Sequence, residues 1–261
     1  MNHKEFLPPK ELENTIKCFW YDRIDVGKEP IAFEVVPDGY IEIIFYFDST
    51  CSIMQNEILQ PLSSPFIMGL LNNPVHFFIE NTLVIIGIRC YQWVGFTLLG
   101  LPPCKGVVPL SEHSVGRIQP ALQEYMNTGK IDGAIAIVRQ YFLNLKLGIT
   151  ADGTLFKAGA AMARAKGTLP VSLVAQAAHA TMRTLERKFM QSSGYTVKDV
   201  SGLMRFEQAR NRLLLEPNTN LARLAYELGY TDQSHFSREF KRYSGYTPAA
   251  FARKSQQDKQ T

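Results

Sequence analysis

The sequence lacks the features that mark membrane-spanning and exported proteins. Its longest apolar runs, residues 40–47 and 83–88, have the length of a strand, far below the roughly 18 residues that cross a bilayer. Residues 1–17 contain no apolar stretch of the signal-peptide type. We therefore expect a cytoplasmic protein that does not contact a membrane.

Cysteine and histidine are too sparse for the common metal and catalytic motifs. The four cysteines form no C-x-x-C pair, and no two histidines are paired; the cysteines are Cys18, Cys51, Cys90 and Cys104. Scattered cysteines in a cytosolic chain are usually small buried apolar residues rather than metal ligands or disulfides. No Ser-His-Asp or Cys-His set and no glycine-rich phosphate loop stands out. We expect no metal, no cofactor and no catalytic activity.

Length and charge indicate two domains of different character. The chain has 261 residues, more than one average domain. Residues 1–150 carry 11 Lys/Arg and 15 Asp/Glu, a net charge of −4, whereas residues 151–261 carry 17 and 9, a net charge of +8. A basic segment fused to a mildly acidic one is typical of a protein whose basic end binds a polyanion such as nucleic acid.

The first half of the chain has the pattern of a β domain. Short runs rich in β-branched and aromatic residues alternate with turn formers such as Pro37-Asp38-Gly39 and Asn72-Asn73-Pro74. The expected strands are Ile31–Val36, Tyr40–Phe47, Pro65–Leu70, Val75–Glu80 and Leu83–Trp93. Helical spacing begins at Gln119 and predicts a helical pair that closes an antiparallel sandwich or barrel. Leu147–Gly153 is the predicted linker between domains 1–150 and 151–261.

The second half is predicted to be all-helical, and it contains an internal repeat. The block Ser-Gly-Tyr-Thr occurs at residues 193–196 and again at 244–247, each time four residues after a phenylalanine. A shift of 51 residues also superimposes Leu173 on Leu224, Arg187 on Arg238, and Phe189 on Phe240. A repeat of this length indicates one supersecondary unit used twice.

The second copy has the pattern of a helix-turn-helix. A short helix with a buried stripe (Leu221, Leu224, Ala225, Leu228) precedes Gly229, which suits the left-handed position that ends a helix. Thr231 or Asp232 can cap the next helix. That helix has one apolar face (Phe236, Phe240, Tyr243) and one polar face, which is the arrangement of a recognition helix.

The first copy follows the same plan. Leu173, Val174 and Ala177 are expected to line its supporting helix, and Thr181 to cap the helix that contains Leu185 and Phe189. Ala178 stands where the second copy has Gly229, and a non-glycine in a left-handed turn costs about 1 kcal/mol. Between the copies, Thr196 can cap a helix over residues 197–216. Its length of roughly 30 Å is close to the ~34 Å between major-groove windows on one face of DNA.

The polar faces of the two second helices supply groups that read and hold DNA. Arg187 and Arg238 can donate two hydrogen bonds to guanine, and Gln233 can pair with adenine. Thr184, Ser234 and Ser237 can bond either bases or phosphates. Residues at the helix sides and start suit phosphates, which position the protein without specifying sequence; they are Thr181, Lys188, Lys241 and Arg242. A plain helical bundle with solvated faces is the alternative.

These residues resemble the AraC/XylS family of bacterial transcription regulators. The resemblance is strongest over residues 221–242 and continues into Gly245-Tyr246-Thr247-Pro248, while residues 205–214 are similar to the linker helix of the family. The resemblance implies base contacts from Arg183, Glu186 and Arg187 in the first unit and from Gln233, Ser234, Ser237 and Arg238 in the second. It also implies a homodimer that activates transcription near RNA polymerase.

The first half is similar to the cupin-like β-barrel that serves some members as a sensor of small molecules. The similarity rests on residues 36–39, on Gly87-Ile88-Arg89 and on Leu98-Leu99-Gly100. The aromatic residues Phe45, Phe47, Phe78 and Trp93 could line a ligand pocket or build the core, and Glu34, Glu42 and Arg89 could orient a polar ligand. Two alternatives remain: a protein-interaction module without an effector, and a cupin-type metalloenzyme, for which His76 and His113 are poor ligands because they form no pair.

Overall fold

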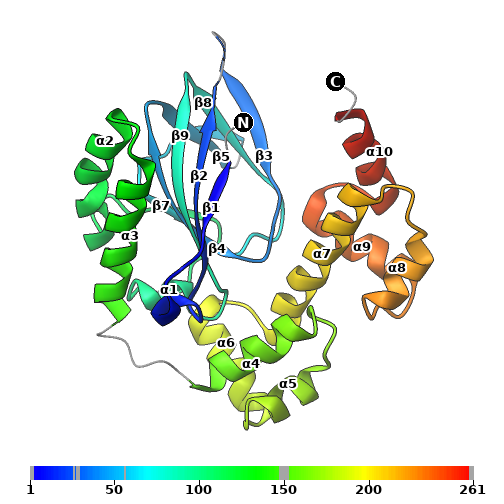
Figure 1. The fold of residues 1–261 in the computed structure, drawn as a ribbon. Helices are drawn as coiled ribbons and strands as arrows, with labels where there is room; N and C mark the ends of the chain where they lie inside the picture. Colours follow the sequence, from blue (N-terminus) through cyan, green and yellow to red (C-terminus); the bar gives the residue numbers. More distant parts are fainter. Residues whose placement is uncertain (1–2, 26, 28–29, 56, 147–152, 259–261) are drawn as a thin grey trace.

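The computed structural model describes residues 3–25, 27, 30–55, 57–146 and 153–258. A β-rich N-terminal part is followed by a helical C-terminal part, as the sequence predicted (Figure 1). The predicted linker, Leu147–Gly153, lies outside the described residues except for Gly153, where α4 begins. Among the helices of the described residues, none combines the length and apolar character that a bilayer crossing requires.

Two antiparallel sheets form the N-terminal part. The larger has the order β1-β2-β9-β4-β7-β10 and the smaller the order β3-β8-β5-β6. The strands are β1 (Lys4–Phe6), β2 (Ile16–Ile24), β3 (Ile31–Val35), β4 (Ile41–Phe47), β5 (Thr50–Gln55), β6 (Ile58–Pro61), β7 (Phe66–Met68), β8 (Val75–Glu80), β9 (Leu83–Cys90) and β10 (Val107–Pro109). The five predicted strands are confirmed as β3, β4, β7, β8 and β9, whereas β1, β2, β5, β6 and β10 were not predicted.

The strands β4 and β9 are apolar apart from Glu42 and Arg89, because both faces of these strands are covered. They pair in register from Ile41 opposite Cys90 to Phe47 opposite Val84. One face packs under helices, and the other faces the smaller sheet, so alternation of polar and apolar residues is lost. The strands that escaped prediction either are short edges or carry mixed residues, such as Ile16–Ile24 with its lysine, aspartate and arginine.

Helices close one side of the sheets. These are α1 (Gly95–Leu98), α2 (Gln119–Asn127) and α3 (Ile131–Lys146), with two short 3-10 helices at Lys10–Leu12 and Ser114–Ile118. The pair predicted from Gln119 onward is confirmed as α2 and α3, which lie on the side of the sheets opposite to the C-terminal helices (Figure 1).

The C-terminal part consists of helices joined by capped turns. They are α4 (Gly153–Arg164), α5 (Val171–Ala177), α6 (Met182–Ser193), α7 (Val197–Leu215), α8 (Leu221–Glu227), α9 (Gln233–Ser244) and α10 (Pro248–Asp258). The Thr181 side chain accepts from the Thr184 amide at the start of α6, and Asp232 performs the same role for the His235 amide in α9. Thr196 and Asp199 form a reciprocal capping box on α7, which confirms the predicted cap.

The turn of the first unit differs from the prediction. The left-handed residue is His179, with φ of 51°, and not Ala178, which is buried. The supporting helix α5 is therefore shifted by one residue relative to the 51-residue repeat. As a consequence, Leu173 is 46% exposed and Ala177 faces solvent, so only Val174 of the three predicted core residues is correct. In the second unit Gly229 holds the left-handed position as expected, with φ of 74°.

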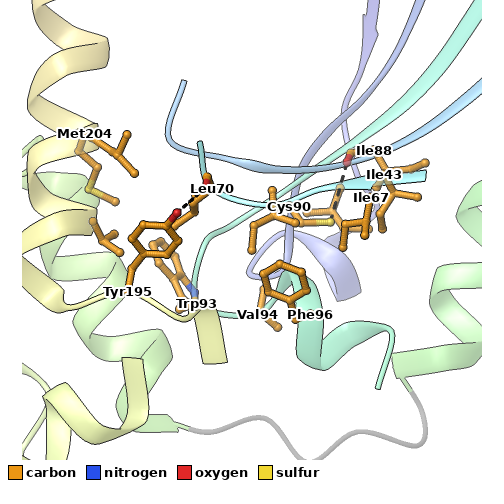
Figure 2. Close-up of a cluster of buried hydrophobic side chains, with 14 of the residues drawn as sticks. Ile43, Ile67, Leu70, Ile88, Cys90, Trp93, Val94, Phe96, Tyr195 and Met204 are labelled. Atoms are coloured by element: carbon orange, nitrogen blue, oxygen red, sulfur yellow. Dashed lines mark hydrogen bonds between the residues drawn. The ribbon is translucent and has the colours of Figure 1, made fainter. Parts of the chain in front are cut away.

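The two parts share one apolar core. A single cluster of buried side chains runs from Ile43 and Ile88 in the sheet, through Trp93 and Phe96, to Met204 on α7 (Figure 2). The close packing of α4 depends on Gly159, because a Cβ at this position would lie 2.3 Å from the Trp93 indole. The helix α4 is thus packed against the two-sheet N-terminal part, which we call the barrel.

Candidate nucleic-acid interface

The helix α9 presents the polar face that the sequence predicted. Phe236, Phe240 and Tyr243 are buried against the core of the second unit. The opposite face is open: Gln233, Ser234, Arg238, Lys241 and Arg242 are exposed, and Ser237 is half-buried. Asp232, in which the His235 amide hydrogen bond lowers the carboxyl pKa, keeps an ionised cap at the start of this helix.

The helix α6 has a similar division with fewer open groups. Leu185 and Phe189 are fully buried, whereas Arg183 and Arg187 are exposed. Gly194 ends α6 in the left-handed conformation, as Gly245 ends α9. The two duplicated blocks therefore build the same helix, cap and stop.

Several predicted DNA contacts already have protein partners. Glu186 on α6 accepts a hydrogen bond from the Val197 amide at 3.1 Å, so its carboxylate holds the start of α7. Arg187 donates to Gln191 one turn away, at 3.1 Å. Thr184 is half-buried and accepts from the hydroxyl of Thr181 at 3.0 Å. Lys188, also half-buried, lies between the two faces of α6.

A buried polar cluster fixes the second unit to α7. Arg205 of α7 donates to Glu239 of α9 at 3.1 Å, and the Tyr230 hydroxyl donates to the same carboxylate oxygen at 2.7 Å. Arg205 also donates to the main-chain oxygen of Gly167 at 3.1 Å, in the turn that precedes α5. Burial raises the pKa of Tyr230, so the phenol stays protonated and remains a donor. One guanidinium therefore connects both units.

The loop between β7 and β8 contacts both helix-turn-helix units. The Tyr195 hydroxyl, from the turn after α6, donates to the main-chain oxygen of Leu70 at 2.6 Å (Figure 2). Asn72 donates to the same hydroxyl at 3.2 Å and accepts from the Arg242 guanidinium at 3.1 Å. In the amide orientation that satisfies its neighbours, Asn73 donates to the main-chain oxygen of Arg242 at 3.2 Å. We name residues 70–74 the bridging loop.

Nothing in the sequence indicates that the bridging loop contacts both helix-turn-helix units. The pattern Asn72-Asn73-Pro74 predicts a turn, and in the structure the chain bends at Asn72 and Asn73. Contacts across 123 and 170 residues of chain have no local signature, because nothing in the spacing of a turn states which distant side chains it meets.

A small apolar cavity of about 80 Å³ lies between the two sheets. Its walls include Trp20, Phe33, Phe77 and Ile85, with Glu42 as the charged member. Phe45, Phe47 and Trp93, predicted as pocket or core, do not line it; all three belong to the buried core. Phe78 is half-buried outside this cavity.

Glu42 and Arg89 lie side by side at the edge of this cavity. The Arg89 Nε donates to the Glu42 carboxylate at 2.7 Å, and its Nη2 lies 3.4 Å from Asp38. Burial raises the pKa of Glu42 to about 7, with the Asp38 charge in the same direction and Arg89 opposing both. Glu34 instead lies 3.4 Å from His76 on the smaller sheet.

The structure shows neither a metal cluster nor a disulfide among the residues it describes. No group of three or more His, Cys, Asp or Glu that could hold a metal ion is found in residues 3–25, 27, 30–55, 57–146 and 153–258. All four cysteines are free; Cys18, Cys51 and Cys90 are buried, and Cys104 is half-buried. Burial raises the pKa of Cys18 and of Cys51 to about 11, which keeps both as thiols.

Two family models match the chain. One, described as a helix-turn-helix domain, matches residues 174–254 and so covers α6 to α9 and most of α5 and α10. The other, described as a domain of unknown function (DUF6597), matches residues 4–105. The two matches fall on the helical part and on the β-rich part respectively.

Among curated proteins, the chain is similar to two regulators. It is 30% identical over 82 residues to the HTH-type transcriptional regulator RipA of Corynebacterium diphtheriae, an alignment that covers 31% of this chain and only 24% of RipA. It is 25% identical over 151 residues to an uncharacterized HTH-type transcriptional regulator in the cgkA 5' region of Pseudoalteromonas carrageenovora, covering 58% of this chain and 75% of that protein. Among solved structures, ToxT from Vibrio cholerae has 10% identity and a TM-score of 0.46, covering 90% of this chain and 97% of ToxT.

Proposed function

We propose that this chain, a transcription regulator with an AraC-type helix-turn-helix domain, binds promoter DNA through α6 and α9. The two helices enter successive major-groove windows on one face of the double helix, and α7 is the rigid connector. The regulator acts in the cytoplasm as a homodimer, activates transcription in contact with RNA polymerase, and catalyses no reaction.

The observation that carries the proposal is the duplicated open face. The helices α6 and α9 have the same length, an N-cap whose side chain accepts from the amide three residues on, and the same left-handed glycine stop, and each keeps one face open. A helical bundle provides no reason to repeat a polar face in this way. The 19 residues of α7 extend about 28 Å at about 1.5 Å per residue, near the ~34 Å of one turn of B-DNA.

The roles of the individual side chains follow from their exposure and partners. Arg238, Gln233 and Ser234 are free to reach base edges from α9. On α6, Arg183 and Arg187 take this role, and Arg187 must first leave Gln191. The remaining proposed contacts are to bases for Thr184, Glu186 and Ser237, and to phosphates for Thr181, Lys188, Lys241 and Arg242.

The N-terminal part is placed to control DNA binding because it touches both units. The bridging loop holds Tyr195 beside α6 and Arg242 at the end of α9. Arg242 must release Asn72 before it can reach a phosphate. A small-molecule effector or dimerisation that moves this loop would therefore change DNA affinity.

Fluorescence anisotropy with the full chain tests DNA binding. DNA fragments enriched by repeated selection are titrated at several salt concentrations, and we expect the logarithm of affinity to fall with a slope of about −4 or steeper, because several phosphates are neutralised. Lys241→Ala should make this slope shallower by about 1, whereas Lys157→Ala, on the exposed side of α4, should not change it. Failure to enrich any fragment at low salt contradicts the proposal.

Control by the N-terminal part is tested separately with Asn72→Ala. If the bridging loop restrains Arg242, this variant should bind the selected fragment a few-fold more tightly, since one hydrogen bond to a charged group no longer has to be broken. Asn127→Ala, at the end of α2, is the matched control. If Asn72→Ala and the parent chain bind the selected DNA fragment with equal affinity, the bridging loop does not restrain Arg242.

A further inference from the structure

A second cavity lies between the two parts of the chain. Its volume is about 180 Å³, and it is bounded by β2 and the ends of β4 and β9 on one side and by α4 and α7 on the other. Unlike the cavity between the sheets, it is lined mainly by polar side chains: Lys17, Tyr40, Tyr91, Gln92, Lys166 and Glu207. Neither the DNA-binding surface nor the bridging loop includes these residues.

The floor of this interdomain cavity needs hydrogen-bond donors. Gln92 is only 2% exposed, and its Oε1 has no hydrogen-bond partner among the described residues. A buried acceptor without a donor costs free energy, so an occupant that donates to it would be stabilised. Glu207 also lines the cavity; it is half-buried, and burial together with the Asp38 charge raises the pKa of its carboxyl group to about 7. One buried acceptor without a donor and one carboxyl group therefore border the same space.

The opposite charge lies at the mouth. Lys17 on β2 and Lys166 after α4 are both exposed, and each comes from a different part of the chain. The rings of Tyr40 and Tyr91 also line the cavity, with their centroids 6.2 Å apart. A cation at the floor and an anion at the mouth, separated by a short apolar body against the tyrosines, would satisfy all of these groups.

We propose that this interdomain cavity binds a small zwitterion, an amino acid or a close analogue, with its ammonium group toward Gln92 and Glu207 and its carboxylate toward Lys17 and Lys166. The size agrees, because the cavity is smaller than the roughly 300–1,000 Å³ typical of drug-sized ligands. The ligand contacts β2, the turn after α4 and α7 at once, so it fastens the connector helix α7 to the larger sheet. This deepens the proposed function by naming the class of effector.

Calorimetric titration of the full chain tests the site. The probes are the proteinogenic L-amino acids, each titrated alone, and, for any that binds, the amine that lacks its carboxylate and the acid that lacks its amine. We expect saturable binding of at least one amino acid, and about tenfold or weaker binding of both truncated forms, because each loses a charge-assisted contact. No binding by any amino acid at millimolar concentration overturns the proposal, as does equal binding of the amine or the acid.

Variants place the ligand in this cavity. Lys166→Ala and Gln92→Leu should each weaken binding by about tenfold or more, while Lys157→Ala, on the exposed side of α4, should leave it unchanged. Cys51→Leu, which fills the cavity between the sheets, should also have no effect; weakened binding in this variant would move the ligand there and contradict the proposal. Unfolding temperatures measured in parallel identify a variant that fails to fold, and Lys166→Ala changes only an exposed side chain. Titration without DNA keeps this result independent of whether the chain binds DNA.

Discussion

The two helix-turn-helix units are built from the same repeated block, yet they have different surroundings. In the first unit Tyr195 is buried and hydrogen-bonded to Leu70 of the barrel. Its counterpart in the second unit, Tyr246, is half-buried, and its hydroxyl accepts from the Nζ of Lys254 on α10 at 3.2 Å. The same four-residue sequence therefore serves as an interdomain joint in one copy and as a local turn in the other.

This difference shows what the N-terminal part can control. Buried side chains of both units belong to the core cluster that also includes the sheets, but α6 of the first unit packs directly on α1, whereas the second unit contacts the N-terminal part through Arg242 and the bridging loop. A rearrangement of the barrel would carry the first unit with it and would release the second. Substitutions at the contacts of each unit therefore test whether the first unit is attached more firmly to the N-terminal part than the second.

The largest effect is expected where α4 rests on the barrel. Gly159→Ala should lower the free energy of unfolding by about 3 kcal/mol, because the new Cβ would overlap the Trp93 indole and force α4 outward. Gly153→Ala, where the Cβ meets open space, should change it by less than about 0.5 kcal/mol. Urea unfolding measures both. Equal stability of the two variants would show that the first unit does not depend on this contact.

The next effect concerns DNA. Arg238→Ala should cost about 2 kcal/mol of binding to the selected fragment and relax its sequence preference, whereas Arg187→Ala should cost about 1 kcal/mol because this guanidinium must first leave Gln191. Arg253→Ala, on the exposed side of α10, is the control. Fluorescence anisotropy on selected and random DNA distinguishes a base contact from a phosphate contact. If Arg238→Ala loses the same affinity for both kinds of DNA, Arg238 contacts a phosphate.

A pH-dependent effect is expected on the side of α7 that faces the barrel. Burial, with the Asp38 charge in the same direction, raises the pKa of Glu207 to about 7 against the opposing Arg210, Arg89 and Lys17. Since the folded pKa lies above the unfolded one, the parent chain loses stability as pH rises from about 4.5 to about 7. Glu207→Gln should therefore be more stable by about 1–2 kcal/mol at pH 8 and equal at pH 5. Thermal unfolding at pH 5 and pH 8 checks this prediction. An equal gain in stability at both pH values would contradict the raised pKa of Glu207.

The duplicated tyrosines give a matched pair of smaller effects. Tyr195→Phe should cost about 1 kcal/mol of unfolding free energy, because the buried Leu70 oxygen loses its donor. Tyr246→Phe should cost less than about 0.5 kcal/mol, since its hydroxyl is accessible to water. If the two substitutions have equal effects, the comparison between an attached and an independent turn is wrong.

The smallest effect concerns the turns inside the two units. His179→Gly should raise stability by about 0.5 kcal/mol, because relief of the left-handed strain outweighs the added freedom of the unfolded chain. Gly229→Ala should lower stability by about 1 kcal/mol at the corresponding position. Chemical unfolding measures both changes. If His179→Gly is destabilising, the His179 side chain makes a contact that stabilises the fold by more than the left-handed backbone strain destabilises it.

The sequence predicted best where a residue acts through its near neighbours. Thr181, Thr196 and Gly229 were assigned correctly because caps and left-handed stops depend on side chains within four residues. The five predicted strands were those with dense apolar patterns. The strand Ile16–Ile24 was missed because its polar residues obscure the pattern and its place in the larger sheet comes from pairing with β9.

The site was predicted less completely because exposure and partners are tertiary properties. Arg238 and Gln233 are exposed as predicted, but Glu186 is engaged with the Val197 amide and Arg242 with Asn72. The left-handed position was assigned to Ala178 because a constant shift of 51 residues was assumed. The shift is 50 in α5, and only the burial of Val174 and Ala175 reveals it.

The repeated unit follows from local and periodic features of the chain: its caps, its glycine stops and its two-faced helices arise in the same way in both copies of the block. Only the tertiary structure decided that Tyr195 joins the barrel, that Asn72 reaches both units, and that Gln92 and Lys166 border one cavity. The difference lies in how far apart along the chain the interacting residues are. Hydrogen bonds within a turn are set by neighbours along the chain, whereas a contact between residues 72 and 242 exists only once two separately encoded cores have packed together.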